Sequence, residues 1–280
     1  MTLSRLVCPA PAKLNLFLHV TGRRADGYHL LQTVFRFIDF ADSLQFDLRS
    51  DGLIAHRNPL PGVLPEQDLT VRAARLLQQE SGCRLGVDIT IDKRLPMGGG
   101  LGGGSSDAAT TLIALNRLWQ AGFSRERLQQ LGLQLGADVP VFVFGRNAFA
   151  EGVGEALQPI ALPPAWYVVL CPPVQVPTAK IFAADNLTRD TAPIKVPVFP
   201  DALTRNDLQS VVCKMFPEVQ FAIDWLAQFG SAKMTGSGAC VFAEFNSRQQ
   251  AESVLESAPA EMQGVVAQGL GVHPLLEWLP

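Results

Sequence analysis

The feature that most constrains this chain is a glycine run between a strand-like segment and a helix-like segment. Residues 93–109 read KRLPMGGGLGGGSSDAA, and six of the seven residues 98–104 are glycine. Glycine loses more conformational entropy on folding than any other residue, so such a run opposes folding. An ordinary connection between a strand and a helix needs only one or two glycines. We therefore interpret the run as a loop whose backbone must approach a bound group closely.

The residues that follow the run indicate what kind of group the loop binds. Ser105, Ser106 and Asp107 open a segment in which apolar residues recur with helical spacing up to Trp119. The first turn of a helix leaves N–H groups unpaired and carries the positive end of the helix dipole. A glycine-rich loop that leads into such a turn forms an anion cradle suited to a polyphosphate.

Other glycine-rich signatures fit this run poorly. Gly98, Gly100 and Gly103 match GxGxxG, but six glycines in seven positions make that match uninformative. A dinucleotide site also needs an acidic residue at the end of a second strand about 20 residues on, whereas Glu126 lies on the polar face of a predicted helix. No GK[ST] follows the run, and no HRD or DFG motif occurs. A nicotinamide-dependent oxidoreductase is therefore a weaker alternative. A non-catalytic nucleotide-binding module is a third option, and it would not need both Lys13 and Asp138.

Composition is typical of a globular protein from a reducing compartment. Of the 280 residues, 48% are hydrophobic. The formal net charge is -3 and the basic residues are dispersed along the sequence, which argues against a nucleic-acid partner. The five cysteines form no CxxC pair and the four histidines are isolated, so we expect neither disulfides nor a zinc site. The chain has no signal-peptide core and no apolar stretch of membrane-spanning length. We expect a cytoplasmic protein without a membrane partner.

Hydrophobic periodicity predicts a chain of mixed α and β structure. Strands are expected at residues 13–20, 30–40, 44–48, 87–91 and 166–172. Helices are expected at residues 68–82, 105–119, 124–135, 207–215 and 217–229. The pattern does not decide between helix and strand for residues 136–145. Prolines cluster after residue 158, which predicts two domains, residues 1–158 and 159–280.

Four separate motifs resemble those of the GHMP kinases, the superfamily of galactokinase, homoserine kinase and mevalonate kinase. In chain order they are PAKLNLFLHVTGRRADGYH from Pro11, PMGGGLGGGSSDAA from Pro96, GADVPVFVFG from Gly136 and TGSGAC from Thr235. The resemblance implies an α+β fold of two domains with the active site in the cleft between them. It places a left-handed βαβ unit in the N-terminal nucleotide domain, against the general rule for such units.

Within this superfamily, the set of motifs is most similar to a kinase that acts on a cytidine-diphosphate sugar alcohol. The resemblance implies ATP and Mg²⁺ as cofactors and a cytidine-diphosphate methylerythritol as the small-molecule substrate. The 2-hydroxyl would accept the phosphoryl group, in a step of the non-mevalonate route to isoprenoid precursors. A kinase of the homoserine or mevalonate type is the alternative, but the tyrosine of the ADGYH turn suits a nucleobase. The sequence identifies neither a metal ligand nor the oligomeric state.

Lys13 and Asp138 are the predicted catalytic residues. Phosphoryl transfer to an alcohol needs a proton acceptor and positive charge around the reacting group. Local sequence alone fits Asp138 equally well as a helix cap, and a strand lysine such as Lys13 is usually solvated. The resemblance favours catalysis: it implies that Asp138 accepts the substrate proton and that Lys13 stabilises the developing negative charge.

The resemblance also assigns residues to the two substrates. The expected ATP-binding residues are Lys93, Pro96, Met97, Gly98, Gly99, Gly100, Leu101, Gly102, Gly103, Gly104, Ser105 and Ser106. The expected residues for the cytidyl substrate are Asn15, Tyr28, His29, Thr178 and Phe182. Tyr28 and Phe182 would sandwich the cytosine ring, and His29 would recognise its edge. Asp68 stands where family members often have an asparagine at the adenine base, and an ionised carboxylate cannot donate a hydrogen bond.

Overall fold

The computed structural model describes residues 4–195 and 204–278, and the described strands form two sheets. The larger sheet follows the path β3 (Ile54–His56), β4 (Gly86–Asp92), β2 (His29–Arg49), β5 (Ala148–Glu151) and β6 (Ala156–Pro159), with β1 (Arg5–Arg23) paired to β2. The smaller sheet follows the path β10 (Gly264–Gln268), β7 (Trp166–Leu170), β9 (Val241–Phe245) and β8 (Lys233–Met234). The chain changes sheet between β6 and β7, whereas our division at residue 158 falls inside β6; the division remains a prediction.

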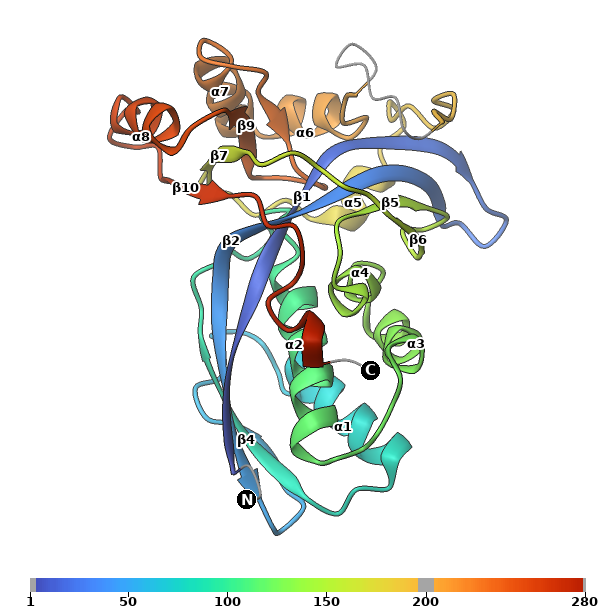
Figure 1. The fold of residues 1–280 in the computed structure, drawn as a ribbon. Coiled ribbons are helices and arrows are strands. Elements are labelled where there is room, and N and C mark those ends of the chain that lie inside the picture. Colours follow the sequence, from blue (N-terminus) through green and yellow to red (C-terminus); the bar gives the residue numbers. More distant parts are fainter. Residues whose placement is uncertain (1–3, 196–203, 279–280) are drawn as a thin grey trace.

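Helices accompany both sheets. Beside the larger sheet lie α1 (Leu69–Ser81), α2 (Gly103–Leu118), α3 (Arg125–Leu135) and α4 (Val139–Phe144). The other half contains α5 (Thr178–Phe182), α6 (Gln209–Met215), α7 (Pro217–Leu226) and α8 (Arg248–Glu256), as Figure 1 shows. A 3₁₀ turn, η2 (Leu276–Trp278), returns to the side of α2. No helix within the described ranges is long and apolar enough to cross a lipid bilayer.

A long antiparallel hairpin of β1 and β2 runs from one half of the molecule to the other (Figure 1). The prediction of two separate strands at residues 30–40 and 44–48 was wrong, because both segments belong to the continuous strand β2. The pairing shifts register between Pro11 and Ala12 on β1, opposite the junction of the two segments. Such a bulge interrupts the alternation of side chains between the two faces, so one bent strand gives the pattern of two.

The helix signals in the sequence are confirmed. Asp68 caps α1, since its side chain accepts from the backbone N–H groups of Thr70 and Val71, and Gly82 ends the helix with a φ of 66°. Ser124 caps α3 in the same way. The undecided segment at residues 136–145 contains a short helix, α4.

The two halves of the molecule are arranged so that α2 begins near their junction. The strands β3 and β4 are parallel neighbours joined by α1, which gives the βαβ unit expected in the first half. Helix α2 packs against α1, α4 and the β1–β2 hairpin, and the apolar face predicted for it is buried. Its N-terminus and the glycine-rich loop face residues 235–240 of the second half, through hydrogen bonds described below.

Candidate active site

The glycine-rich loop connects β4 to α2 and is held against the second half of the chain. The backbone N–H groups of Ala239 and Cys240 donate to the carbonyl oxygens of Gly98 and Gly99, at 3.1 and 3.0 Å. Gly100 has a φ of +74°, and a Cβ on it would lie 2.1 Å from the Thr235 carbonyl oxygen. Part of the glycine run is therefore required by close backbone packing against Thr235.

A cavity of about 380 Å³ opens in front of the loop. Its lining combines apolar side chains, polar side chains and the loop itself. The apolar residues are Leu60, Val63, Leu69, Ile91, Pro96 and Met97, and the polar ones include Gln67, Asp68, Thr70 and Lys93. The glycines of residues 98–104 and Ser105 in the first turn of α2 complete it. An apolar slot beside a helix N-terminus suits a flat base joined to a chain of phosphates.

Ser105 and Ser106 point to different surroundings. Ser105 lines the cavity, whereas Ser106 is fully buried and its hydroxyl donates to the Pro11 carbonyl oxygen at 2.7 Å. The structure therefore brings Ser105 to the cavity with the rest of the expected loop residues and uses Ser106 to fix α2 on β1.

Lys13 and Asp138 lie in contact beside the loop. The Lys13 ammonium is 3.2 Å from Asp138 Oδ2 and 3.1 Å from the Gly100 carbonyl oxygen, and it also donates to Asn15 Oδ1. The Lys13 side chain is 3% exposed, whereas that of Asp138 is 37% exposed. Asp138 precedes α4 but its side chain caps no helical N–H. Its carboxylate is thus open to a substrate beside an immobilised positive charge.

A second cavity, of about 300 Å³, is lined in part by this pair. Its lining includes Lys13, Asn15, Thr33, Phe35 and Phe182. It shares several lining residues with the first cavity: Gly100, Ser105, Asp138, Thr178 and Ser237. Two spaces that meet at one carboxylate can hold a phosphoryl donor and an alcohol acceptor with their reacting groups adjacent.

The residues expected to hold the cytidyl group are divided between this cavity and its surroundings. Asn15 and Thr178 line the cavity, and the Thr178 hydroxyl is 2.7 Å from that of Ser237. The rings of His29 and Phe182 are 5.0 Å apart between centroids and tilted by 30°. Tyr28 is 64% exposed at the turn before β2, so no described side chain covers most of its ring.

His29 is tied to a guanidinium group. Arg189 Nε donates to His29 Nε2 at 3.2 Å. Burial and the positive charges of Arg189 and Arg23 lower the pKa of His29. Because Nε2 accepts from Arg189, the neutral ring carries its proton on Nδ1, which leaves one N–H donor for the edge of a base.

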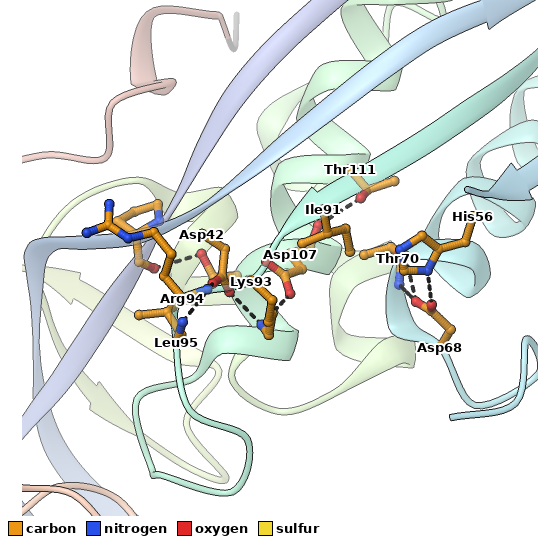
Figure 2. Close-up of polar contacts among 12 residues, drawn as sticks. Asp42, His56, Asp68, Thr70, Ile91, Lys93, Arg94, Leu95, Asp107 and Thr111 are labelled. Carbon is orange, nitrogen blue, oxygen red and sulfur yellow. Dashed lines mark hydrogen bonds and ion pairs between the residues drawn. The ribbon is translucent and has the colours of Figure 1, made fainter. Parts of the chain in front are cut away.

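Lys93 lines the first cavity but is held by two carboxylates (Figure 2). Its ammonium lies 2.5 Å from Asp42 Oδ2 and 2.7 Å from Asp107 Oδ2. Burial alone would lower the pKa of Lys93, but the two carboxylates outweigh it and raise the pKa. Neither Asp42 nor Asp107 had an assigned role in the sequence, although Asp107 belongs to the glycine-rich motif.

Asp68 also lines the first cavity and is bound to His56 (Figure 2). His56 Nδ1 is 2.6 Å from Asp68 Oδ2, and the Thr70 hydroxyl donates to Asp68 Oδ1 at 2.6 Å. Burial would raise the pKa of Asp68, but these hydrogen bonds outweigh it and lower the pKa to about 2. The carboxylate is therefore ionised and accepts hydrogen bonds only, as the sequence led us to expect.

Comparison with known families identifies both halves of the chain. Residues 68–146 match the GHMP kinases N terminal domain, and residues 199–264 match the GHMP kinases C terminal family. The glycine-rich loop and Asp138 fall within the first match. Residues 235–240, which hold the loop, fall within the second.

Full-length relatives and solved structures give a narrower assignment. The chain is 64% identical over 278 residues to 4-diphosphocytidyl-2-C-methyl-D-erythritol kinase of Aromatoleum aromaticum, covering 99% of this chain and 98% of the relative. The enzyme of the same name from Thiobacillus denitrificans is 64% identical over 272 residues, covering 97% and 98%. A crystal structure of 4-(cytidine 5'-diphospho)-2C-methyl-D-erythritol kinase superposes with a TM-score of 0.83 at 36% identity, covering 95% of this chain and 100% of that one.

A more distant structure shares the fold alone. Methanococcus jannaschii mevalonate kinase superposes with a TM-score of 0.69 at 16% identity, covering 95% of this chain and 99% of that one. The expected α+β architecture of two GHMP kinase domains is thus confirmed. With two family matches in order and relatives of more than 60% identity along nearly the whole length, the chain belongs to the 4-diphosphocytidyl-2-C-methyl-D-erythritol kinase family of the GHMP kinases.

Proposed function

We propose that this chain transfers the γ-phosphoryl group of ATP to the 2-hydroxyl of 4-diphosphocytidyl-2-C-methyl-D-erythritol. Asp138 takes the hydroxyl proton as the new O–P bond forms, and ADP leaves with the electrons of the broken P–O bond. The observation that carries the proposal is the 3.2 Å contact between Lys13 and Asp138 at the point where two cavities meet.

Lys13 supplies positive charge where the alkoxide develops. Its ammonium is fixed by the Asn15 side chain and by the Gly100 carbonyl oxygen, so it needs no rearrangement during the reaction. Preorganised charge of this kind stabilises a transition state more than mobile water does. Because Gly100 belongs to the phosphate loop, one hydrogen bond links the charge at the acceptor to the loop that holds the donor.

ATP fits the first cavity in one orientation. The apolar side chains of the lining take the adenine ring, and the glycine-rich loop with Ser105 takes the phosphates at the first turn of α2. Mg²⁺ enters with ATP, whose phosphate oxygens supply ligands that this ion prefers. We assign no protein ligand to the ion.

The cytidyl substrate fits the second cavity and the turn beside it. Phe182 and Tyr28 stack on the cytosine ring, and His29 binds its edge. Asn15 and Thr178 line the path from that ring to Asp138 and contact the polar methylerythritol unit. These assignments place the acceptor hydroxyl beside the carboxylate that is to deprotonate it.

An assay with a panel of alcohols tests this function. Purified protein is mixed with ATP and Mg²⁺ and with the cytidyl compound, homoserine or mevalonate, and ADP release is measured. We expect ADP release that depends on the cytidyl compound and is at background with the other two. Faster release with homoserine or mevalonate would assign the chain to another activity of the GHMP kinase fold.

A further inference from the structure

Two cysteine thiols lie in contact at one end of the strands β7 and β9, next to the glycine-rich loop. Cys171 follows β7 and Cys240 precedes β9, and their sulfur atoms are 3.7 Å apart. All five cysteines of the chain lie within the described ranges and are free thiols. The pair is therefore in its reduced form, with both sulfur atoms close enough to react with each other after a small movement.

The two cysteines occupy a cross-strand position that accommodates a disulfide. They come one step beyond the last paired residues of β7 and β9, and their backbone groups bond to other partners. The Cys171 N–H donates to the Gln263 carbonyl oxygen. The Cys240 N–H donates to Gly99, and the Cys240 carbonyl oxygen accepts from Thr235. In such a non-hydrogen-bonded antiparallel pair the opposite Cα atoms are about 4.5 Å apart, within the range of about 4.4–6.8 Å that a disulfide spans.

We propose that Cys171 and Cys240 are a site of reversible oxidation, at which a peroxide converts the two thiols to a disulfide that weakens ATP binding by the glycine-rich loop. The effect on ATP rests on the proposed function. Cys171 reacts first, because it is half-buried whereas Cys240 is 1% exposed. Cys240 also donates its S–H to Cys171 Sγ, and this hydrogen bond lowers the pKa of Cys171 although burial opposes it. A larger thiolate fraction favours attack on a peroxide.

The reaction has two steps and consumes one molecule of hydrogen peroxide. The Cys171 thiolate attacks a peroxide oxygen, so that an S–O bond forms, the O–O bond breaks, and hydroxide leaves and takes up a proton to give water. Cys171 is then a sulfenic acid, and the Cys240 sulfur attacks its sulfur atom. The S–S bond forms, the S–O bond breaks, and hydroxide leaves with the Cys240 proton as a second water. The two sulfur atoms together lose two electrons, which reduce the peroxide.

A disulfide at this position changes the support of the glycine-rich loop. The two sulfur atoms must approach from 3.7 Å to about 2.05 Å. The Cys240 N–H donates to the Gly99 carbonyl oxygen at 3.0 Å, and Cys240 Sγ lies 2.8 Å from the place that a Cβ on Gly99 would occupy. Gln175, four residues after Cys171, places its Cβ 3.5 Å from the corresponding position on Gly98. A shift of either cysteine therefore moves a residue on which the loop rests.

Peroxide treatment of the purified protein tests this site. Protein is reduced with dithiothreitol, freed of it and exposed to hydrogen peroxide, and the remaining thiols are blocked by alkylation. Mass spectrometry of unreduced peptides identifies the cross-link between Cys171 and Cys240, and calorimetric titration measures the binding of Mg·ATP. We expect the cross-link to form and the Kd for Mg·ATP to rise about tenfold, as for the loss of one hydrogen bond to a charged group. Dithiothreitol should reverse both changes.

Two variants separate the thiol pair from general oxidation. Cys171→Ser cannot form the cross-link but keeps Cys240 against the loop, so peroxide should leave its Kd for Mg·ATP unchanged. Cys213→Ser is the matched control, because Cys213 is another half-buried thiol of the second half, on α6. Peroxide should raise its Kd as much as that of the wild type.

Three outcomes would overturn the inference: a wild-type protein that forms no cross-link, a cross-linked protein with an unchanged Kd, or an equal rise in the Kd of Cys171→Ser. A reduced wild-type protein that binds no Mg·ATP would instead contradict the proposed function, and formation of the cross-link would still test the thiol pair.

Discussion

The Lys13 ammonium and the Asp138 carboxylate lie 3.2 Å apart, although one residue belongs to the first strand and the other follows the third helix. Lys13 is almost fully buried and makes two further hydrogen bonds, whereas Asp138 keeps an open side toward both cavities. The pair thus combines a fixed cation with an accessible base, which is the arrangement that phosphoryl transfer to an alcohol needs.

Replacing Lys13 by methionine tests the electrostatic half of this pair. We expect kcat to fall by about 10²–10³, the range found when one preorganised donor to a developing negative charge is removed. KM for the cytidyl substrate should change little, since Lys13 acts on the reacting oxygen. Steady-state kinetics at saturating ATP measure both values, and circular dichroism checks the fold. A kcat within a few-fold of wild type would mean that the cation is structural.

Gly100→Ala tests the close packing of the phosphate loop. The new Cβ would meet the Thr235 carbonyl oxygen at 2.1 Å, and the residue keeps a φ of +74°. Gly62→Ala is the control, because Gly62 has a φ of +77° and no atom within 4 Å of the added Cβ. In the control, the free energy of unfolding should fall by only about 1–2 kcal/mol, which is the cost of placing alanine in a left-handed conformation. For Gly100→Ala the free energy of unfolding should fall by about 1–3 kcal/mol more than in the control, because the added Cβ overpacks the loop. This variant should also bind ATP more weakly. Equal decreases for the two variants in urea denaturation would contradict the packing role.

Tyr28→Ala tests the aromatic contact with the cytosine ring. We expect KM for the cytidyl substrate to rise about tenfold, because a stacked ring contributes about 1–3 kcal/mol to the binding of a base. KM for ATP should not change. Tyr28→Phe keeps the ring and should behave as wild type. A Tyr28→Ala enzyme with an unchanged KM for the cytidyl substrate would remove Tyr28 from the site.

His273 gives the fold a specific sensitivity to acid. Burial lowers its pKa to about 3, and its Nδ1 accepts the backbone N–H of Leu275. The unfolded chain binds this proton near pH 6.5, so stability from the neutral ring is complete above that pH and declines toward pH 3. The free energy of unfolding should fall by about 1.4 kcal/mol per pH unit in this window. The free energy of unfolding of His273→Asn should differ less between pH 6 and pH 4 than that of the wild type. Denaturation at the two pH values measures this difference, and an equal difference in the two proteins would contradict the assignment.

Much of this architecture could be predicted from local sequence. The α1 caps at Asp68 and Gly82 follow from residue chemistry alone, and so does the buried face of α2. The continuity of β2 could not be predicted, because the bulge near Pro11 depends on pairing with a partner strand. Periodicity and the proline cluster predicted mixed α and β structure in two domains, but the specific GHMP kinase fold was supplied by the motif resemblance.

In the candidate site, too, a local sequence motif predicts some residues, whereas others become neighbours only after folding. The glycine-rich loop is a local motif, and the contact of Lys13 with Asp138 was expected from resemblance to a family. Asp42 was missed because its partners, Lys93, Arg94 and Leu95, are about fifty residues away and adjacent only after β2 and β4 pair. A buried aspartate in a strand has no local pattern that separates it from an exposed one.

Single-turnover phosphoryl transfer by Asp138→Asn is the most direct test of the account. Enzyme in excess over the cytidyl substrate is mixed rapidly with ATP, the reaction is quenched, and product is measured over time. Asparagine keeps the shape of the side chain but cannot accept the hydroxyl proton as a carboxylate does, so the rate should fall by about 10²–10⁴. Binding of ATP and of the cytidyl substrate should be retained. A transfer rate close to wild type would contradict the role of Asp138 as the general base.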